Sequence, residues 1–490
     1  MSASEPTTGR LLLRNTLYLT ISQALTIPIS FLVNALSARY LGPEVFGLAY
    51  LAGTMCGLGF LAVSWGHEGV LPAEVARDHS VAGELLGSSL AWRSALGLVV
   101  YGVLALVCRL LGYGADFQWA LALTALLQLF TSYCASCKDT IRGFERTDIP
   151  AIAHVAQQFL AAVLVVCVLL LGGRLRAALL VQWIACVAIL IGLTRSLGTV
   201  GVGALKPTKL ATKNLLKGGT PFVIFNIAMM LQPNIDAIFL SKLASFDAVG
   251  WYAVAGKIVG ALLFPATALI GAFYPTLSRL YGTDLESFKR TSSGAMRTVS
   301  LLVVPVSLGC ALYPGIPVAF FSRKSFGPAE DDLRLMAAYI FLLYFSMPLG
   351  TCVLAAGKQR AWSIVQSLCV ITSLILDPIL VPWFEKHMGN GGLGVCIGIV
   401  VSELVVVACG LKLAPAGIVD RRFLRGVALP LVAGVGMVAV ARATHAWSPF
   451  ISGPLALVAY VAALRLTGAV SNEELASLRG FVARRFSRSA

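Results

Sequence analysis

Fourteen apolar segments, separated by short polar connectors, fill this chain almost from one end to the other. A helix needs about 20 mostly apolar residues to cross a bilayer, and each segment is close to that length. Charged residues are only 12% of the chain, against about 25% in soluble domains. We therefore predict an all-α polytopic membrane protein of about 14 transmembrane helices. The expected spans are Thr16 to Ala38, Phe46 to Ser64, Leu90 to Leu111, Trp119 to Cys137, Ile149 to Leu171, Ala178 to Leu193, Pro221 to Leu240, Trp251 to Phe273, Leu301 to Phe321, Met336 to Ala356, Ile364 to Trp383, Leu393 to Leu413, Val427 to Ala441 and Phe450 to Leu466.

The net charge of +15 follows from membrane topology rather than from nucleic-acid binding. Along the predicted helix order, 27 lysines and arginines fall at the two termini and in every second connector, while 10 fall on the opposite side. Because Lys and Arg accumulate on the cytoplasmic side of membrane proteins, both termini are predicted to be cytoplasmic. We expect no nucleic-acid partner.

The eleven cysteines all lie in apolar segments, where a thiol packs as a small hydrophobic group. Cys134 and Cys137 form a CxxC motif without a second cysteine pair or a nearby histidine, so helix packing is favoured over metal or redox chemistry. No catalytic residue and no metal site are predicted.

The chain contains an internal repeat. At an offset of 203 residues, RYLGPEVFGLAYLAG (39–53) aligns with KLASFDAVGWYAVAG (242–256), which pairs Arg39 with Lys242, Gly47 with Gly250 and Gly53 with Gly256. GFER (143–146) and GKQR (357–360) match farther on. Six helices separate the paired hairpins, so the repeat is parallel, about an axis along the membrane normal. The predicted parts are an N-lobe (1–205), a C-lobe (206–415), a helix pair (416–470) and a basic cytoplasmic tail (471–490) that is either an amphipathic surface helix or a disordered segment.

The two hairpins, with FYPTLSRL (273–280) and NGGLGVCIGIVVSELVVV (390–407), resemble the polysaccharide-biosynthesis (Wzx-type) family of lipid-linked oligosaccharide flippases. These belong to the multidrug/oligosaccharidyl-lipid/polysaccharide exporter superfamily. The resemblance implies two six-helix lobes around a cavity that opens alternately to the two membrane faces. It also implies the substrate, an undecaprenyl-pyrophosphate-linked glycan that moves from the cytoplasmic to the outer leaflet. His67 and Glu68 stand where many relatives have small apolar residues.

Ionisable groups inside spans are costly and are functional candidates by default. Asp236 and Lys257 lie in adjacent predicted helices joined by a short outer turn and are predicted to be close enough to meet. Lys257 then offers positive charge to the pyrophosphate while Asp236 holds it or exchanges a proton. The alternative is a structural ion pair.

Four further polar residues are candidates for substrate binding. The guanidinium of Arg39, at the outer end of the first span, suits a diphosphate, or else it snorkels to the interface. Gln23 and Asn34 are three turns apart and share one helix face, where they bond either sugar hydroxyls or neighbouring helices. Arg142 is placed to receive the lipid pyrophosphate at the cytoplasmic side, although membrane orientation alone also predicts it.

Carboxylates in a medium of low dielectric can titrate near neutral pH. Glu68, Asp377 and Glu403, with His67 beside Glu68, are therefore candidates for coupling transport to a proton or Na+ gradient. Asp377 precedes Pro378, so bonding to backbone groups freed at a kink is its alternative role. No other cofactor is expected.

The predicted function is a flippase of the bacterial cytoplasmic membrane, a transporter rather than an enzyme. Its partners are the lipid-linked glycan, membrane lipids, and the polymerase and glycosyltransferases of the same pathway. Two alternatives stay open: a multidrug or cation antiporter of the same superfamily, and a glycosyltransferase that uses a polyprenyl donor. The run GWYAVAGK (250–257) has five residues between its glycines rather than four, so it is not a nucleotide-binding loop.

Overall fold

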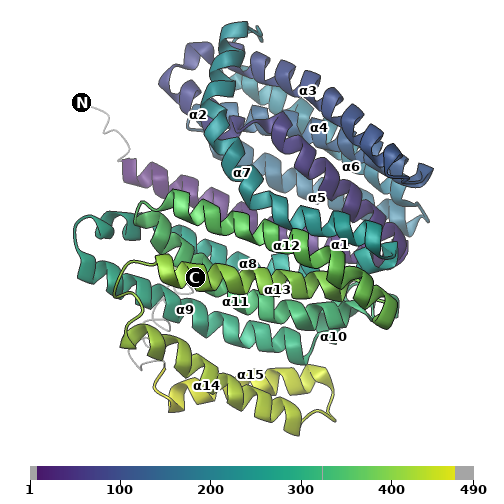
Figure 1. The fold of residues 1–490 in the computed structure, drawn as a ribbon. Coiled ribbons are helices and arrows are strands. Elements are labelled where there is room, and N and C mark those ends of the chain that lie inside the picture. Colours follow the sequence, from purple (N-terminus) through teal and green to yellow (C-terminus); the bar gives the residue numbers. More distant parts are fainter. Residues whose placement is uncertain (1–7, 323, 470–490) are drawn as a thin grey trace, which may run out of the picture. The chain divides into compact units, whose positions relative to one another are not determined.

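The computed structural model describes residues 8–322 and 324–469, and every regular element in these ranges is a helix (Figure 1). The predicted amphipathic tail at 471–490 lies outside them. The helices are α1 (Thr8–Ser64), α2 (His67–Arg77), η1 (His79–Val81), α3 (Ala82–Leu110), α4 (Ala115–Gly143), α5 (Asp148–Leu170), α6 (Leu175–Val200), α7 (Lys209–Leu243), α8 (Phe246–Tyr281), α9 (Leu285–Leu312), α10 (Gly315–Ala319), α11 (Ala329–Ala355), α12 (Gln359–Met388), α13 (Gly392–Leu413), α14 (Arg421–Ala443) and α15 (Pro449–Leu466).

The predicted membrane spans correspond to these long helices. Within the described ranges, twelve segments are long and apolar enough to cross a bilayer. Two further predicted spans are covered by the second arm of the 57-residue α1 and by the 35-residue α7. The prediction of an all-α polytopic membrane protein is therefore confirmed.

The first connector differs from the expectation, because it is helical on both sides of a single break. α1 runs from Thr8 to Ser64, and only Gly42 departs from helical geometry, with φ 78° and ψ 169°. Glycine adopts this positive φ without steric cost, and Pro43 then starts the second arm with its preset φ. The segment after α1 also folds as a helix. Gly66, in left-handed geometry, separates α1 from this helix, α2.

Side-chain caps fix where several helices begin. Thr208 accepts a bond from the Ala211 amide at the start of α7, and Asp284 accepts bonds from the Glu286 and Ser287 amides at the start of α9. Asp420 does the same for Phe423 at the start of α14. Each cap satisfies amides that have no partner within the helix.

The chain divides into two compact units. Among the described residues, unit 1 comprises 8–257, 324–326 and 377–392. In it α4 packs on α6, α1 on α5, and α3 on α4, while α7 contacts α1, α2 and α3. One of its hydrophobic core clusters contains Leu86, Cys134, Ile141, Cys186 and Leu193.

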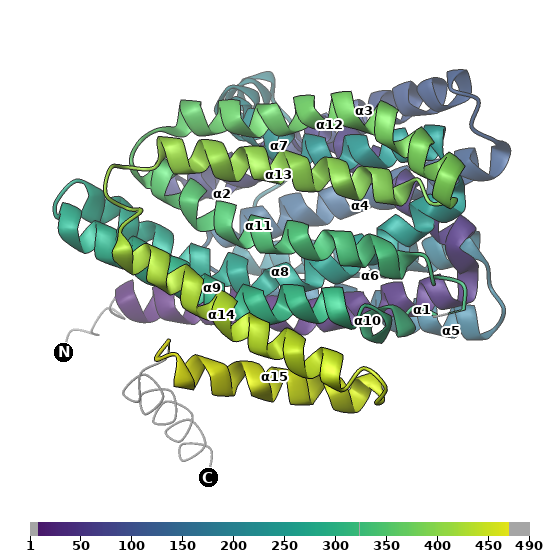
Figure 2. The same cartoon turned by 60° about the horizontal axis from the view of Figure 1, so that its bottom comes forward.

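Among the described residues, unit 2 comprises 258–322, 327–376 and 393–469. In it α9 packs against both α11 and α14, and α14 and α15 form a hairpin whose arms lie side by side (Figure 2). Tyr460 of α15 donates to the carbonyl oxygen of Leu301 in α9, at 3.1 Å. The predicted last helix pair therefore packs on α9.

Candidate functional site

Two acidic side chains from different helices of unit 1 face each other. Asp236 lies on α7 and Asp377 on α12, and both are 0% exposed. Their carboxyl groups are close enough to interact directly. Two full negative charges near each other in a medium of low dielectric repel strongly, so protonation of one carboxyl group or a bound cation would stabilise the pair. Sequence reasoning assigned separate roles to these residues, and the fold brings them together.

Tyr50, on the second arm of α1, lies near Asp236. The charge of Asp236 acts on the Tyr50 hydroxyl, and the Tyr50 ring packs edge-on against Tyr252, with ring centroids 6.3 Å apart. The Lys257 ammonium lies 5.8 Å from the centroid of the same ring, within the range of a cation–π contact. Asp236 and Lys257, expected to meet each other, are thus each placed beside a different partner, and Tyr50 lies near both.

The paired glycines of the internal repeat touch across the two hairpins. A methyl group on Gly47 would overlap the Phe246 carbonyl oxygen and lie 2.7 Å from the Gly250 nitrogen. A methyl group on Gly250 would overlap the Pro43 carbonyl oxygen and lie 2.8 Å from its carbonyl carbon. The backbones of α1 and α8 therefore approach as closely as residues without Cβ allow. We call this contact the glycine seam.

The same end of unit 1 carries a second contact, between the α3–α4 turn and the end of α7. Ser241 donates to the Ile238 carbonyl, so Tyr113 donates to the Ser241 oxygen, at 2.7 Å. The Lys242 ammonium lies 3.3 Å from the Tyr113 ring centroid and donates to the Leu111 carbonyl, at 2.6 Å. Burial raises the pKa of Tyr113 above its ordinary value, which keeps the donating hydroxyl protonated.

A buried polar network joins α2, α3 and α4. His67 is 1% exposed, and its Nδ1 lies 2.9 Å from the Ser89 hydroxyl, which lies 2.9 Å from the Ser136 hydroxyl. Arg93, 2% exposed, donates from Nε to Ser89, at 3.4 Å. His67 is thus fixed between two membrane helices next to a buried cation.

Two other predicted residues, Arg142 and Glu68, belong to the same helices as this network. Arg142 is exposed and donates to the buried Asp139, at 2.9 Å, while Glu68 is exposed and accepts a bond from Asn226 of α7, at 2.7 Å. Glu68 and His67, adjacent in sequence, therefore have different surroundings.

The remaining predicted residues differ in their exposure and in their bonding partners. Arg39 and Gln23 are exposed on the first arm of α1. Asn34 donates to the Ser30 carbonyl of its own helix, at 2.7 Å. Glu403 is buried in unit 2, where its carboxyl interacts with Ser346 of α11.

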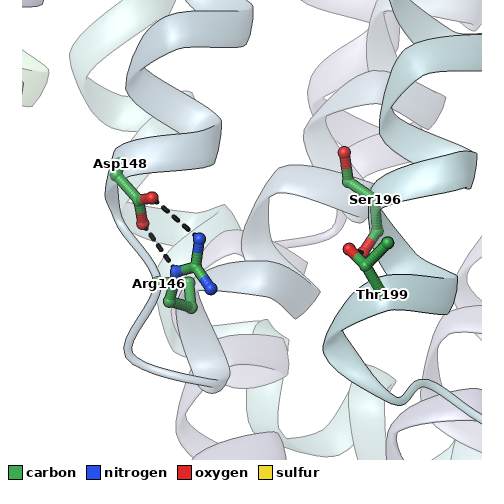
Figure 3. A network of polar contacts seen from close by, with 4 residues as sticks. All are labelled: Arg146, Asp148, Ser196 and Thr199. Carbon is green, nitrogen blue, oxygen red and sulfur yellow. Dashed lines mark hydrogen bonds and ion pairs between the residues drawn. The ribbon is translucent and has the colours of Figure 1, made fainter.

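The turn between α4 and α5 holds a bidentate ion pair. Arg146 donates from two nitrogens to the two carboxylate oxygens of Asp148, each at 2.9 Å, and Figure 3 shows the parallel bonds. Nearby on α6, Thr199 donates to the Ser196 carbonyl, at 2.8 Å. Because Asp148 accepts bonds from two of its guanidinium nitrogens, Arg146 stabilises this turn.

Unit 2 contains an apolar groove of about 710 Å³ between α9, α11, α13 and α14. Arg334 is the charged residue among its lining side chains; the others include Leu308, Phe341, Leu404 and Val435. A groove of this composition suits a hydrocarbon chain rather than a sugar.

Sequence reasoning did not single out Tyr50, Ser89, Ser136 or Asp139. Asp139 had a usable signal, because it stands three residues before Arg142 near the end of an apolar span. The serines had none, since small hydroxyl residues are common in membrane helices for packing alone.

Solved structures of membrane transporters share the fold of this chain. It resembles the lipid II flippase MurJ in an inward closed conformation, with a TM-score of 0.73 and 14% identity over 92% of this chain and 98% of that one. It also resembles an inward-facing multidrug resistance MATE family transporter, with a TM-score of 0.65 and 17% identity over 81% and 97% of the two chains. At these identities the likeness concerns the fold alone.

The family follows from sequence. Residues 12–281 match the model of the family described as polysaccharide biosynthesis protein, and the chain belongs to that family. A curated relative, the probable flippase AglR of Haloferax volcanii (strain ATCC 29605 / DSM 3757), is 22% identical over 268 residues, which are 54% of this chain and 55% of the relative. The chain thus matches about half the length of that relative. It is a multi-pass membrane protein of this family.

Proposed function

We propose that the protein is a flippase that moves an undecaprenyl-pyrophosphate-linked oligosaccharide or polysaccharide repeat unit to the outer leaflet by alternating access. The observation that carries the proposal is the family match over residues 12–281. The apolar groove of unit 2 supports a lipid-linked cargo, because a polyprenyl chain needs an apolar surface to lie on.

The location and partners of the protein form part of the same proposal. We place it in a bacterial cytoplasmic membrane, and the distribution of its basic residues supports termini that lie in the cytoplasm. Its glycan would come from the glycosyltransferases of the pathway and pass to a polymerase at the outer face. No covalent chemistry falls to this chain.

The cationic side chains have a role in this scheme. Lys257 is exposed at its position beside Tyr50, and we propose that its ammonium contacts the pyrophosphate. Arg39, exposed at the end of the first arm of α1, would bind the same group. Gln23 and Asn34 would contact the sugars.

The facing carboxyl groups of Asp236 and Asp377 are proposed as the coupling site. A cation that binds between them neutralises the pair, and its loss leaves a repulsion that favours separation of α7 from α12. A conformational change is thereby coupled to a proton or Na+ gradient. His67, Glu68 and Glu403 remain further candidates for this role.

Leaflet-resolved labelling tests the activity. Purified protein in sealed vesicles that contain undecaprenyl-pyrophosphate-linked glycan should deliver glycan to the opposite leaflet, where a lectin or an added glycosidase reaches it. Asp236→Asn and Asp377→Asn should abolish the dependence on an imposed ion gradient. Delivery no faster than in protein-free vesicles would contradict the flippase.

The antiporter alternative is supported by the fold likeness to the MATE transporter. The same vesicles, loaded with a fluorescent organic cation, distinguish it: gradient-driven cation efflux without glycan delivery would replace the proposal. Glycan transfer by the purified protein onto an acceptor would instead favour the glycosyltransferase.

A further inference from the structure

A basic pocket lies at the start of α7, outside the residues assigned to transport. It has a volume of about 670 Å³ and is lined by Trp65, Pro207, Thr208, Lys209, Thr212, Lys213, Leu216, Lys217 and Thr220. All of these residues belong to unit 1. The lining contains three lysines and no carboxylate.

The lysines form a row along the helix. Lys209, Lys213 and Lys217 are spaced four residues apart, so they lie on one side of α7 and span about 12 Å of its length. All three are exposed, and like charges at this spacing destabilise a helix unless an anion neutralises them. Glu84, which does not line the pocket, accepts a bond from the Thr208 hydroxyl at the start of the helix.

The hydroxyl groups of the pocket are not available as donors. Thr212 donates to the Thr208 carbonyl and Thr220 to the Leu216 carbonyl, at 2.9 and 2.8 Å. An anion in this pocket is therefore held by the ammonium groups, which favours a ligand recognised by charge. Phosphate oxygens meet this requirement.

Trp65 forms a fixed floor for the row. Its indole Nε1 donates to the Leu216 carbonyl, at 3.1 Å, and its ring packs edge-on against Trp92 at 6.0 Å. A methyl group on Gly219 would overlap the Trp65 carbonyl oxygen, so the α1–α2 turn lies directly on α7. Indole rings in membrane proteins favour the depth of the lipid headgroups.

We propose that this pocket binds the phosphate headgroup of a lipid in the cytoplasmic leaflet. Basic pockets between membrane helices on the cytoplasmic side are suited to anionic headgroups, and the pocket combines three such cations with an interfacial tryptophan. Two sources share this chemistry: a resident anionic phospholipid and a polyprenyl diphosphate. The site does not depend on the proposed transport activity, since either lipid binds whether or not the chain moves a glycan.

Lipid titration of the purified full-length protein tests the site, with bound lipid counted by mass spectrometry of the intact complex. The probes are phosphatidylglycerol and undecaprenyl diphosphate, with phosphatidylcholine as the lipid without net charge. The test variant is Lys209→Gln/Lys213→Gln/Lys217→Gln. A matched control, Arg195→Gln/Arg290→Gln/Arg360→Gln, removes equal charge at exposed residues that do not line the pocket.

The lysine variant should bind at least one anionic probe about a hundredfold more weakly, since each surface lysine contributes roughly 1 kcal/mol to such binding. The control variant should bind each anionic probe with an affinity within about threefold of that of the unchanged protein. The probe whose binding is tighter and depends on the lysines identifies the source of the phosphate group. Equal weakening in both variants, or none in the lysine variant, would overturn the site. Thermal unfolding of each variant verifies that the protein is folded. The single variant Lys213→Gln repeats the lipid titration with only one charge removed.

Discussion

Alanine at Gly47 or Gly250 is expected to separate the backbones of α1 and α8. The added methyl on Gly250 would lie 2.8 Å from the Pro43 carbonyl carbon and 3.0 Å from its Cα. Carbon atoms prefer about 3.5 to 4.0 Å, so the two backbones must move apart by roughly 1 Å. Neither neighbour is a flexible side chain that can turn away.

The cost follows from this geometry. Overpacking of a close contact typically costs about 1 to 3 kcal/mol, which corresponds to roughly a fivefold to 150-fold shift away from the conformation in which the seam is closed. Because the two glycines share one seam, the second substitution should cost less once the first has opened it. The double variant is therefore expected to be less destabilised than the sum of the single variants.

The repeat supplies matched controls. Gly53 and Gly256 are related by the same offset, and a methyl group on either meets no atom within 4 Å. Alanine there should be neutral or slightly stabilising, since alanine is the better helix former. The assay is thermal unfolding in detergent, followed by tryptophan fluorescence, for all four single variants and the seam double variant.

Equal unfolding midpoints for the seam and control variants would refute the reasoning. So would full additivity in the double variant, because it would mean that the glycines do not share one contact. A lower midpoint for Gly47→Ala and Gly250→Ala alone would support it.

Three further predictions concern the contacts of Tyr113, Asp420 and His67. Tyr113→Phe removes the hydrogen bond to Ser241 but leaves the ring under Lys242, and should lower the free energy of unfolding by about 1 kcal/mol. Lys242→Met should lower it further, because this variant loses both the cation and its bond to the backbone. Unchanged thermal unfolding in both variants would show that the contact does not stabilise the protein. Asp420→Ala should destabilise α14 by about 1 kcal/mol and Asp420→Asn by less, because asparagine still caps, whereas identical losses would show that the cap is not the cause. His67→Ala should lower stability more than Glu68→Ala, since His67 is buried against Ser89 and Glu68 is exposed, and the reverse order in the same assay would contradict the burial argument.

The site was predictable only in part, and particular residues show why. The sequence placed Asp236 and Asp377 in membrane spans, which marks each as costly and therefore functional. It did not pair them, because 141 positions separate them and hydropathy contains no information on which helices are neighbours. The repeat aligned Gly47 with Gly250, but that alignment predicts equivalent positions and not a direct contact.

One prediction from local pattern misplaced detail. The connector after the first span was expected to be a polar loop, whereas helix continues on both sides of Gly42. A backbone dihedral at one residue determines this outcome, and a count of apolar residues does not detect it.

The sequence by itself determined that this chain folds in lipid as many helices, because a bilayer permits no other use of long apolar segments that satisfies the backbone. It also determined the repeat, the distribution of basic residues and the family. Only the tertiary structure decided which side chains meet: Asp236 with Asp377, Tyr113 with Lys242, and Trp65 with the start of α7. These contacts depend on helix rotation and packing, which arise from close approach of backbones such as those at Gly47 and Gly250.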